Sequence, residues 1–351
     1  MDITAIDLFC GVGGLTHGLI KAGLNVVAGV DIEPSCKFAY ETNNHAIFIN
    51  EDITTIKASE LEKYYSTDCI RVLVGCAPCQ PFSKYSSRYR KNGHNDGKWK
   101  LLSYFQNIAK EILPDIISIE NVPNLVHEQV FLDFLEELRK LEYSYDWQIV
   151  YCPDYGVPQK RKRLVLLASK LGAIKMIDPL YSENNYKTVR MAISSLPKIS
   201  DGEICSSDAL HRASKLSEIN KKRIKQSRPG GTWRDWDEEL KVACHKKNSG
   251  QTYPSVYGRM KWDEPSPTIT TQFYGYGNGR FGHPEQDRAL SLREGAILQS
   301  FPSDYVFLDS EHPTTKHSLA MQIGNAVPVE LGYAVGLSIK QHINEMIKKG
   351  K

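Results

Sequence analysis

The segment DLFCGVGGL (7–15) constrains most strongly what this chain can fold into. It follows an apolar run, TAIDLF, that is typical of a short buried strand, and it opens a segment, LTHGLIKAG, with a helical pattern. Gly11, Gly13 and Gly14 provide the turn between them. A strand, a glycine turn and a helix in this order predict the first βα unit of a Rossmann-like sheet, in which the turn binds a cofactor.

The pattern of strand followed by helix continues through the first half of the chain. Four further segments are rich in β-branched residues, namely NVVAGVD, CIRVLVGC, IISIENV and RLVLLAS. Helical stretches such as FLDFLEELRKL lie between them. Strands that alternate with helices predict an α/β fold with a doubly wound, mostly parallel sheet. After about residue 172 the segments become short, polar and basic, until a helical period returns in ALSLREGAILQSF and a last helix is expected over 329–348. We therefore predict one domain formed by 1–178 and 318–351 and a smaller, loop-rich domain formed by 179–317.

Two acidic residues lie at the ends of expected strands, where they could accept hydrogen bonds from a cofactor. Asp31 lies 20 residues after Gly11, at the end of the second expected strand, where a carboxylate binds ribose hydroxyls. Asp52 follows the third expected strand and is placed to accept from an adenine amino group. The dinucleotide fingerprint is incomplete, because Thr16 occupies the place of its third glycine and the turn holds no basic residue. A cofactor with ribose and adenine but no pyrophosphate fits better, and S-adenosylmethionine is such a molecule; a turn of purely structural purpose is the alternative.

The cysteine content and the hydropathy of the sequence indicate the cellular compartment of the protein. The chain has 351 residues, enough for a substantial core, and its eight cysteines show no disulfide-framework spacing, which indicates reduced thiols in a cytoplasmic protein. No apolar run approaches the roughly 20 residues that a membrane helix needs. The opening MDITAIDLFCG lacks a basic region, so we expect no secretory signal and no membrane association.

Positive charge is concentrated in two regions, although the net charge is only +3. Residues 210–262 contain 13 Lys/Arg against 5 Asp/Glu, and residues 84–100 contain 6 against 1. Aromatic residues are interleaved with the cations in both. Clustered cations with aromatics suit a nucleic-acid backbone, although a solvated basic face explains either cluster alone equally well.

The segment VLVGCAPCQPFS (72–83) contains two cysteines three positions apart, Cys76 and Cys79. Structural zinc needs four ligands, and the chain has no second cysteine pair, so we expect no metal. A redox pair would open a helix, which Gln80 and Pro81 disfavour. The third interpretation is a single nucleophile at Cys79, in a loop stiffened by prolines at the carboxyl end of a strand, with Cys76 as a small buried residue.

At this point a family resemblance emerges from six motifs in a fixed order. They are DLFCGVGGL, CAPCQPFS, ENVPNL (120–125), QKRKRLVLLAS (159–169), RALSLREGAILQSFP (288–302) and QIGNAVPVELG (322–332). With the basic region between the fourth and the fifth motif, the chain resembles the DNA (cytosine-5) methyltransferases of bacterial restriction-modification type.

The resemblance implies a catalytic set. Cys79 would attack C6 of a cytosine, because covalent addition makes C5 nucleophilic enough to accept a methyl group. Glu120, as the protonated acid, would hold N3 of the ring. Arg163 would contact O2, with Arg161 two residues earlier on the same strand face. The base must first be flipped out of the duplex.

The resemblance also implies the cofactor and DNA contacts. Asn325 and Val327 would close the cofactor pocket if the last helix returns beside the first strand. The full cofactor set is Phe9, Gly11, Gly13, Gly14, Asp31, Ile32, Asp52, Ile53, Pro78, Asn325 and Val327. DNA contacts are expected from two places, a mobile lid after Pro81 and the smaller domain, which would recognise the target. The residues are Ser83, Lys84, Arg88, Arg90, Arg228, Arg234, Arg259, Thr270 and Arg280.

The function predicted is therefore methyl transfer from S-adenosylmethionine to C5 of a cytosine in a specific sequence of double-stranded DNA. We expect a monomer that protects DNA from a separately acting cognate restriction endonuclease. A transfer-RNA cytosine methyltransferase of the same architecture is the main alternative. A non-catalytic DNA-binding relative is disfavoured by the intact Cys79, Glu120 and Arg163, and a nicotinamide dehydrogenase is disfavoured by Thr16.

Overall fold

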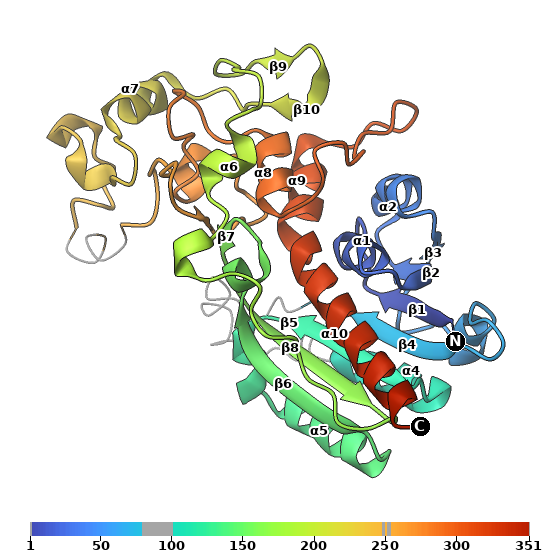
Figure 1. Ribbon diagram of the computed structural model, residues 1–351. Coiled ribbons are helices and arrows are strands. Elements are labelled where there is room, and N and C mark those ends of the chain that lie inside the picture. Colours follow the sequence, from blue (N-terminus) through green and yellow to red (C-terminus); the bar gives the residue numbers. More distant parts are fainter. Residues whose placement is uncertain (1, 79–100, 248–249, 251–253, 351) are drawn as a thin grey trace. The chain divides into compact units, whose positions relative to one another are not determined.

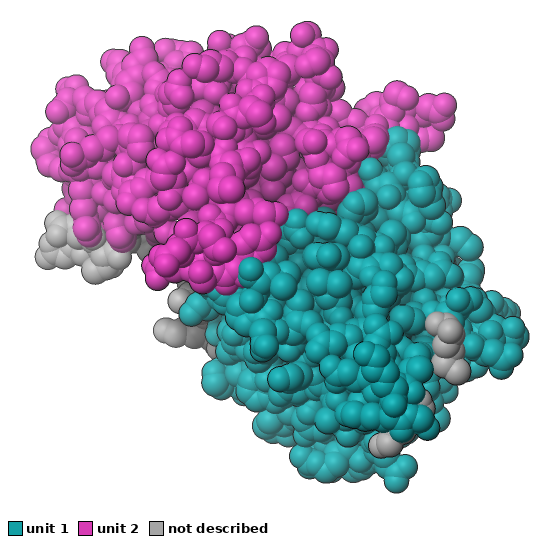
Figure 2. Space-filling model, in the orientation of Figure 1, with its two compact units in different colours: residues 1–155, 162–180, 327–351 teal, residues 156–161, 181–326 magenta. Residues whose placement is uncertain are grey.

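The computed structural model describes residues 2–78, 101–247, 250 and 254–350, which form two compact units. Unit 1 comprises 1–155, 162–180 and 327–351, and unit 2 comprises 156–161 and 181–326 (Figure 2). We expected the chain to return to the first domain at residue 318. That position falls inside α9 (Lys316–Asn325), which packs against α8 (Leu292–Leu298) within unit 2. The assignment of a function to each unit stays a prediction.

Unit 1 is built around a seven-stranded sheet with the order β3-β2-β1-β4-β5-β8-β6 (Figure 1). The strands from β3 to β5 are parallel, and β8 is antiparallel to both β5 and β6. The predicted α/β fold with a mostly parallel Rossmann-like sheet is confirmed. The strands are β1 (Ile3–Leu8), β2 (Asn25–Asp31), β3 (Ile47–Asn50), β4 (Ile70–Gly75), β5 (Ile116–Asn121), β6 (Ser144–Tyr151) and β8 (Lys162–Ser169).

One strand of this sheet was not expected from the sequence. β6 lies at the edge of the sheet, and its sequence, SYDWQIVY, alternates polar and apolar residues from Ser144 to Ile149, although Trp147 and Ile149 are exposed. An alternating edge strand lacks the continuous β-branched run by which the central strands were recognised. The helices of unit 1 are α1 (Gly14–Lys21), α2 (Lys37–Asn44), α3 (Ala58–Glu62), α4 (Leu101–Ile112), α5 (Gln129–Lys140) and α10 (Val329–Lys348).

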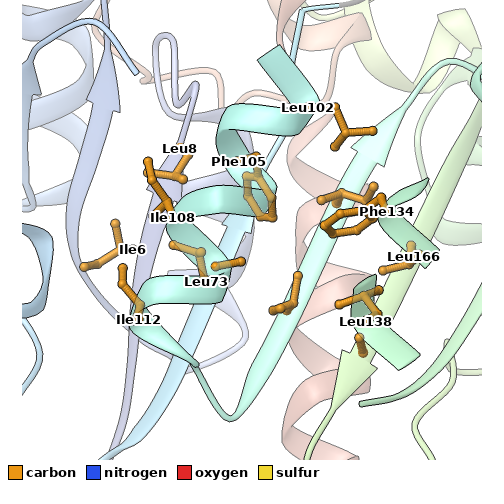
Figure 3. Packing of buried hydrophobic residues seen from close by; sticks show 14 of the residues in the cluster. Ile6, Leu8, Leu73, Leu102, Phe105, Ile108, Ile112, Phe134, Leu138 and Leu166 are labelled. Atoms are coloured by element: carbon orange, nitrogen blue, oxygen red, sulfur yellow. The ribbon is translucent and has the colours of Figure 1, made fainter. Parts of the chain in front are cut away.

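One apolar core of unit 1 lies between one face of the sheet and the helices α3, α4 and α5 (Figure 3). Ile6 and Leu8 of β1 point into it, together with Phe105 of α4 and Phe134 of α5. Because side chains alternate along a strand, the residues between these, including Asp7, face the opposite side of the sheet. Glu120 of β5 and Arg163 of β8 alternate in the same way with the core residues Ile119 and Leu164.

The opposite side carries α1 and α10, which pack closely against each other. A Cβ atom on Gly18 of α1 would collide with the backbone of Val329 and Tyr333, so only glycine allows this approach. We expected the last helix to lie beside the first strand. Its main contact is with α1, the helix that directly follows that strand.

Unit 2 has short elements and its own small apolar core. Two two-stranded sheets pair β7 with β11 and β9 with β10. The core gathers Trp233, Trp236 and Tyr276 around Ile224. The elements not yet named are β7 (Gln159–Lys160), α6 (Val189–Ile193), β9 (Ile204–Cys205), β10 (Asp208–Arg212), α7 (Glu218–Gln226) and β11 (Ser266–Pro267).

Candidate active site

The strand registers bring the candidate residues of unit 1 to one edge of the sheet. Leu8 of β1 lies opposite Gly75 of β4, and Gly75 lies opposite Ile119 of β5. Asp31, the last residue of β2, pairs with Asn50 of β3. The loops after β1, β2, β4 and β5 therefore leave the sheet at its carboxyl edge, which is where open α/β sheets bind their ligands.

The glycine turn after β1 has the backbone conformation that its sequence predicts. Gly11 and Gly13 have φ angles of 51° and 86°, in the left-handed region that favours glycine. Phe9 has a φ of 62°, which is strained for a residue with a Cβ and is typical of functional sites. Among the described residues, no atom beyond Gly11 and its two chain neighbours lies within 4 Å of where a Cβ on Gly11 would stand, so the turn is open at this position.

Asp31 links the turn to the second strand. Its Oδ2 accepts from the backbone N–H of Gly11 at 2.8 Å, and its Oδ1 accepts from the N–H of Glu33 at 2.9 Å. Burial raises the pKa of this carboxyl, and the two backbone hydrogen bonds oppose the rise. Each oxygen keeps a lone pair for another donor. The next side chain, Ile32, is 64% exposed and offers an apolar surface beside the carboxylate.

The other predicted cofactor residues are placed less uniformly. Asp52 accepts from the N–H of Thr54 at 2.9 Å, and the side chain of Ile53 is buried in the core. Val327 is buried in unit 1, whereas Asn325 belongs to unit 2, where it ends α9. Gly14 is buried at the start of α1, and Pro78 is exposed. Whether these residues bind a cofactor stays a prediction.

Asp7 is a residue of the glycine motif that sequence reasoning did not single out. It is fully buried, and its Oδ2 accepts from Oγ1 of Thr16 at 2.7 Å. The same Oγ1 lies 3.2 Å from the hydroxyl oxygen of Tyr40, within hydrogen-bond distance. Thr16, which stands in place of the third glycine of the dinucleotide fingerprint, thus joins α1 to β1 through its side chain. Burial raises the pKa of Asp7 to about 7, although the Thr16 hydrogen bond lowers it.

This raised pKa gives a pH-dependent stability that one substitution should remove. Because the folded chain holds the Asp7 proton more tightly than the unfolded chain, the contribution of Asp7 to stability is complete only at low pH and is lost as the pH rises through about 7. Asp7→Asn cannot ionise. The unfolding free energy of the variant minus that of the native chain should therefore be about 2–3 kcal/mol larger at pH 8 than at pH 5. Urea unfolding at both pH values measures this, and a constant difference would contradict it.

Glu120 is the centre of a polar group at the end of β5. Its side chain is only 4% exposed, and its Oε1 lies 2.8 Å from Nε of Arg163, which extends from the neighbouring strand β8. Its Oε2 accepts from the Cys76 thiol at 2.8 Å. Glu120 and Arg163 were predicted together, and the structure brings them into contact. Cys76 was expected to be a small buried residue, but it is partly exposed and it contacts the carboxylate.

Asn121 is a second residue whose role the sequence did not reveal. Its Nδ2 donates to the carbonyl of Ala77 at 3.1 Å, and its Oδ1 accepts from the N–H of Val122 at 2.8 Å. The amide therefore joins the end of β5 to the loop that follows β4. The Glu-Asn-Val motif thus has two structural tasks, because its glutamate faces Arg163 and Cys76 while its asparagine holds the neighbouring loop.

Arg161 is not on the same strand face as Arg163, contrary to our expectation. It lies between β7 and β8, because the backbone turns there and its N–H bonds to the carbonyl of Gln159 at 2.8 Å. It belongs to unit 2, in which its Nη1 donates to the carbonyl of Ile269 at 3.1 Å. The strand was predicted to continue through a position at which the chain changes direction.

The predicted DNA contacts of unit 2 differ in their exposure. Arg228 is exposed and pairs with Asp235, and Arg234 is exposed above the ring of Trp233. Arg280 and Thr270 are partly buried, and Nε of Arg280 has no hydrogen-bond partner among the described residues.

Arg259 is different, because only 5% of it is exposed. Its guanidinium donates to the carbonyls of Ile224, Ser227, His283 and Gln286 and pairs with Asp287. These are the contacts of an arginine that holds the fold together.

Five of the predicted residues lie outside the described part of the chain, and nothing in the structure bears on them. They are Cys79, Ser83, Lys84, Arg88 and Arg90. Within the described residues no group of three or more His, Cys, Asp or Glu side chains could hold a metal ion, and the cysteines are free thiols. None of the helices described is both long enough and apolar enough to cross a membrane.

Fold and carboxyl-edge site together define a Rossmann-like methyltransferase, and comparison with known proteins identifies its family. The family model for C-5 cytosine-specific DNA methylases matches residues 3–341, so the chain belongs to that family. It is 52% identical over 341 residues to the Type II methylase M.HgiDII of Herpetosiphon aurantiacus, covering 96% of this chain and 95% of the relative. It is 31% identical to the Type II methyltransferase M1.HphI of Haemophilus parahaemolyticus, covering 98% and 89%.

Solved structures support the fold. The crystal structure of a protein assigned as a DNA modification methyltransferase encoded within an E. coli prophage superposes with a TM-score of 0.73 at 21% identity, covering 98% of this chain and 100% of that one. A mutant of Spodoptera frugiperda DNMT2 superposes with a TM-score of 0.66 at 17% identity, covering 95% and 98%. The predicted family and enzyme class are confirmed: the chain is a C-5 cytosine DNA methyltransferase, and its family uses S-adenosylmethionine.

Proposed function

We propose that this protein methylates C5 of a flipped-out cytosine in a specific double-stranded DNA sequence, through a covalent bond between Cys79 and C6. The observation that carries the proposal is the contact of Glu120 with Arg163 at the carboxyl edge of the sheet, beside the loop that leads into Cys79. A buried carboxyl and a guanidinium held side by side match the N3 and O2 atoms of a cytosine ring, which need a proton donor and a cation.

The residues of the chain would act in sequence. The Cys79 thiolate forms a bond to C6, and Glu120 supplies a proton to N3 so that the ring becomes an enamine and not an anion. Arg163 stabilises the electron density that gathers on O2. S-adenosylmethionine supplies an electrophilic methyl group. After C5 has accepted this group, loss of the C5 proton and cleavage of the sulfur–C6 bond regenerate Cys79.

The cofactor would be held by the turn after β1 and by the end of β2. Asp31 has lone pairs left for ribose hydroxyls, and the exposed Ile32 offers an apolar face to adenine. The open space above Gly11 leaves room for the methionine part. For Ile53 the backbone is the part available, because the side chain is in the core. The proposed set is completed by Phe9, Gly13, Gly14, Asp52, Ile53, Pro78, Asn325 and Val327.

Replacing Asp31 tests this cofactor assignment. Asp31→Ala leaves the ribose hydroxyls without their acceptor, and hydrogen bonds to charged groups contribute about 1.5–3 kcal/mol. Affinity for S-adenosylhomocysteine should fall roughly ten- to a hundredfold in a calorimetric titration. Glu33→Ala, which removes an exposed carboxylate two residues away, is the matched control and should bind normally. Unchanged affinity of Asp31→Ala would show that the ribose binds elsewhere.

Unit 2 would read the DNA. It carries the basic, aromatic-rich region and the exposed Arg228 and Arg234, whereas Arg259 would support the fold from within. Arginine on guanine is the commonest base contact, so Arg228, Arg234 and Arg280 are the candidates to test first. We further propose that the protein acts as a monomer in the cytoplasm and protects DNA from a cognate restriction endonuclease, as its relatives' Type II names suggest.

A mechanism-based trap tests the covalent step. A duplex with 5-fluorocytosine at the target should form a complex with the protein that survives denaturation, because fluorine at C5 blocks the final elimination. Bisulfite sequencing of DNA from an expressing host identifies the target beforehand. The Cys79 adduct would be excluded if the protein methylates the ordinary duplex normally but forms no denaturant-resistant complex with the fluorinated duplex. Methylation of transfer RNA but not of duplex DNA would exclude the proposed substrate.

A further inference from the structure

The first cysteine of the Cys-Ala-Pro-Cys segment has a contact that the proposed mechanism does not use. Cys76 directly follows β4, and its backbone N–H bonds to the carbonyl of Leu8 at 3.3 Å, so the β1–β4 pairing fixes its position. From there its thiol reaches Oε2 of Glu120 at 2.8 Å. The pair joins the ends of two neighbouring parallel strands, β4 and β5.

The two oxygens of Glu120 face different donors. Oε1 faces Nε of Arg163, and Oε2 faces the thiol of Cys76. Arg163 is itself held, because its Nη1 donates to the carbonyl of Lys162 at 2.8 Å. The terminal torsion of a glutamate side chain is soft, so a single contact leaves the carboxyl plane free to turn. The ion pair with Arg163 on Oε1 and the hydrogen bond from Cys76 on Oε2 together fix that plane.

The same contact separates the chemical roles of the two cysteines. A thiolate beside a carboxylate would be repelled by it, so Cys76 is stable next to Glu120 as a neutral S–H donor. A nucleophilic cysteine needs the opposite environment, with cationic or dipolar help. The surroundings of Cys76 therefore suit a hydrogen-bond donor and not a second nucleophile.

We infer that Cys76 is a positioning residue, whose thiol orients the carboxyl of Glu120 toward the N3 edge of the cytosine. This inference rests on the proposed role of Glu120. It goes beyond that proposal because it gives the first cysteine a task of its own, acting through the glutamate and not on the base.

Three variants test the role of the donor. Cys76→Ala removes it, and kcat for methyl transfer should fall on the order of three- to thirtyfold, since one hydrogen bond to the Glu120 carboxyl is lost and the thiol is a weak donor. Cys76→Ser keeps a donor and should recover the rate to within about threefold of the native chain. Cys69→Ala is the matched control, because it removes a thiol at the opposite end of β4, and its kcat should not change.

A double-mutant cycle shows whether the effect passes through Glu120. In a Glu120→Ala background the acceptor is absent, so adding Cys76→Ala should not lower the single-turnover rate further. Three outcomes would each overturn the inference. Cys76→Ala could lower the rate equally in both backgrounds, Cys76→Ser could be as slow as Cys76→Ala, or Cys76→Ala could be as fast as the native chain. If Glu120→Ala alone were fully active, the proposed role of Glu120 would fail instead.

Discussion

Cys79→Ser is expected to abolish methyl transfer, with a loss of about a thousandfold or more in the single-turnover rate. The serine hydroxyl is far less acidic than a thiol and is not ionised near neutral pH, so it cannot add to C6 of the ring. The assay follows transfer of a radiolabelled methyl group to a duplex that contains the target. Binding of S-adenosylhomocysteine and of DNA should persist, because neither depends on the nucleophile.

The contrast with Cys76 makes this prediction specific. Cys76→Ser should stay within a few-fold of the native rate, because an O–H can replace the S–H that faces Glu120. A Cys76→Ser variant as inactive as Cys79→Ser would indicate that the two thiols work as a pair, in redox or metal chemistry. A Cys79→Ser variant with substantial activity would remove the covalent mechanism altogether.

The sheet was predictable because its central strands are buried on both faces. Such strands are continuous apolar, β-branched runs, which is why β1, β2, β4, β5 and β8 could be located from the sequence. Their carboxyl ends then follow from parallel topology, which places Glu120 of β5 at that edge. Arg163 was expected to act with it only from the family resemblance, because it lies near the amino end of the antiparallel strand β8. β6 gave no such signal, because at the edge of the sheet it exposes residues such as Trp147.

Side-chain contacts between distant segments were not predictable. Cys76 and Glu120 are 44 positions apart, and nothing in the spacing shows that the thiol points toward the carboxylate. The same holds for Asp7 and Thr16, where the threonine was noticed only as a missing glycine. Composition likewise cannot separate an exposed arginine such as Arg234 from the buried Arg259, since both lie in the same basic region.

Unit 2 contains a second buried ionic group, formed by Arg288 and Glu294. Arg288 is fully buried, and its Nη1 and Nη2 donate to the two Glu294 oxygens at 2.8 and 2.7 Å. Burial alone would raise the pKa of Glu294, but the hydrogen bonds and charge of Arg288 outweigh it and lower the pKa. His283, 3.6 Å from Glu294, does not replace the arginine, because burial lowers its pKa to about 4 and leaves it neutral near pH 7.

Removing one partner of this pair should therefore be costly. Arg288→Met leaves the Glu294 carboxylate buried without its counter-charge, and breaking a buried pair in this way costs about 3–5 kcal/mol. The free energy of unfolding, measured by urea titration with tryptophan fluorescence, should fall by that amount. The control is Arg190→Met, which breaks the exposed ion pair between Arg190 and Asp263 and should leave the unfolding midpoint unchanged.

A double substitution distinguishes an uncompensated charge from a simple packing defect. Arg288→Met with Glu294→Leu removes both charges and replaces them with apolar side chains, which in buried pairs is often close to neutral. The double variant should therefore regain most of the stability that Arg288→Met alone loses. If it is as unstable as the single variant, the loss comes from the other contacts of the two side chains, and the charge pair itself contributes little. These contacts join Arg288 to the carbonyls of Ile199 and Ala289 and Glu294 to the N–H of Ser291.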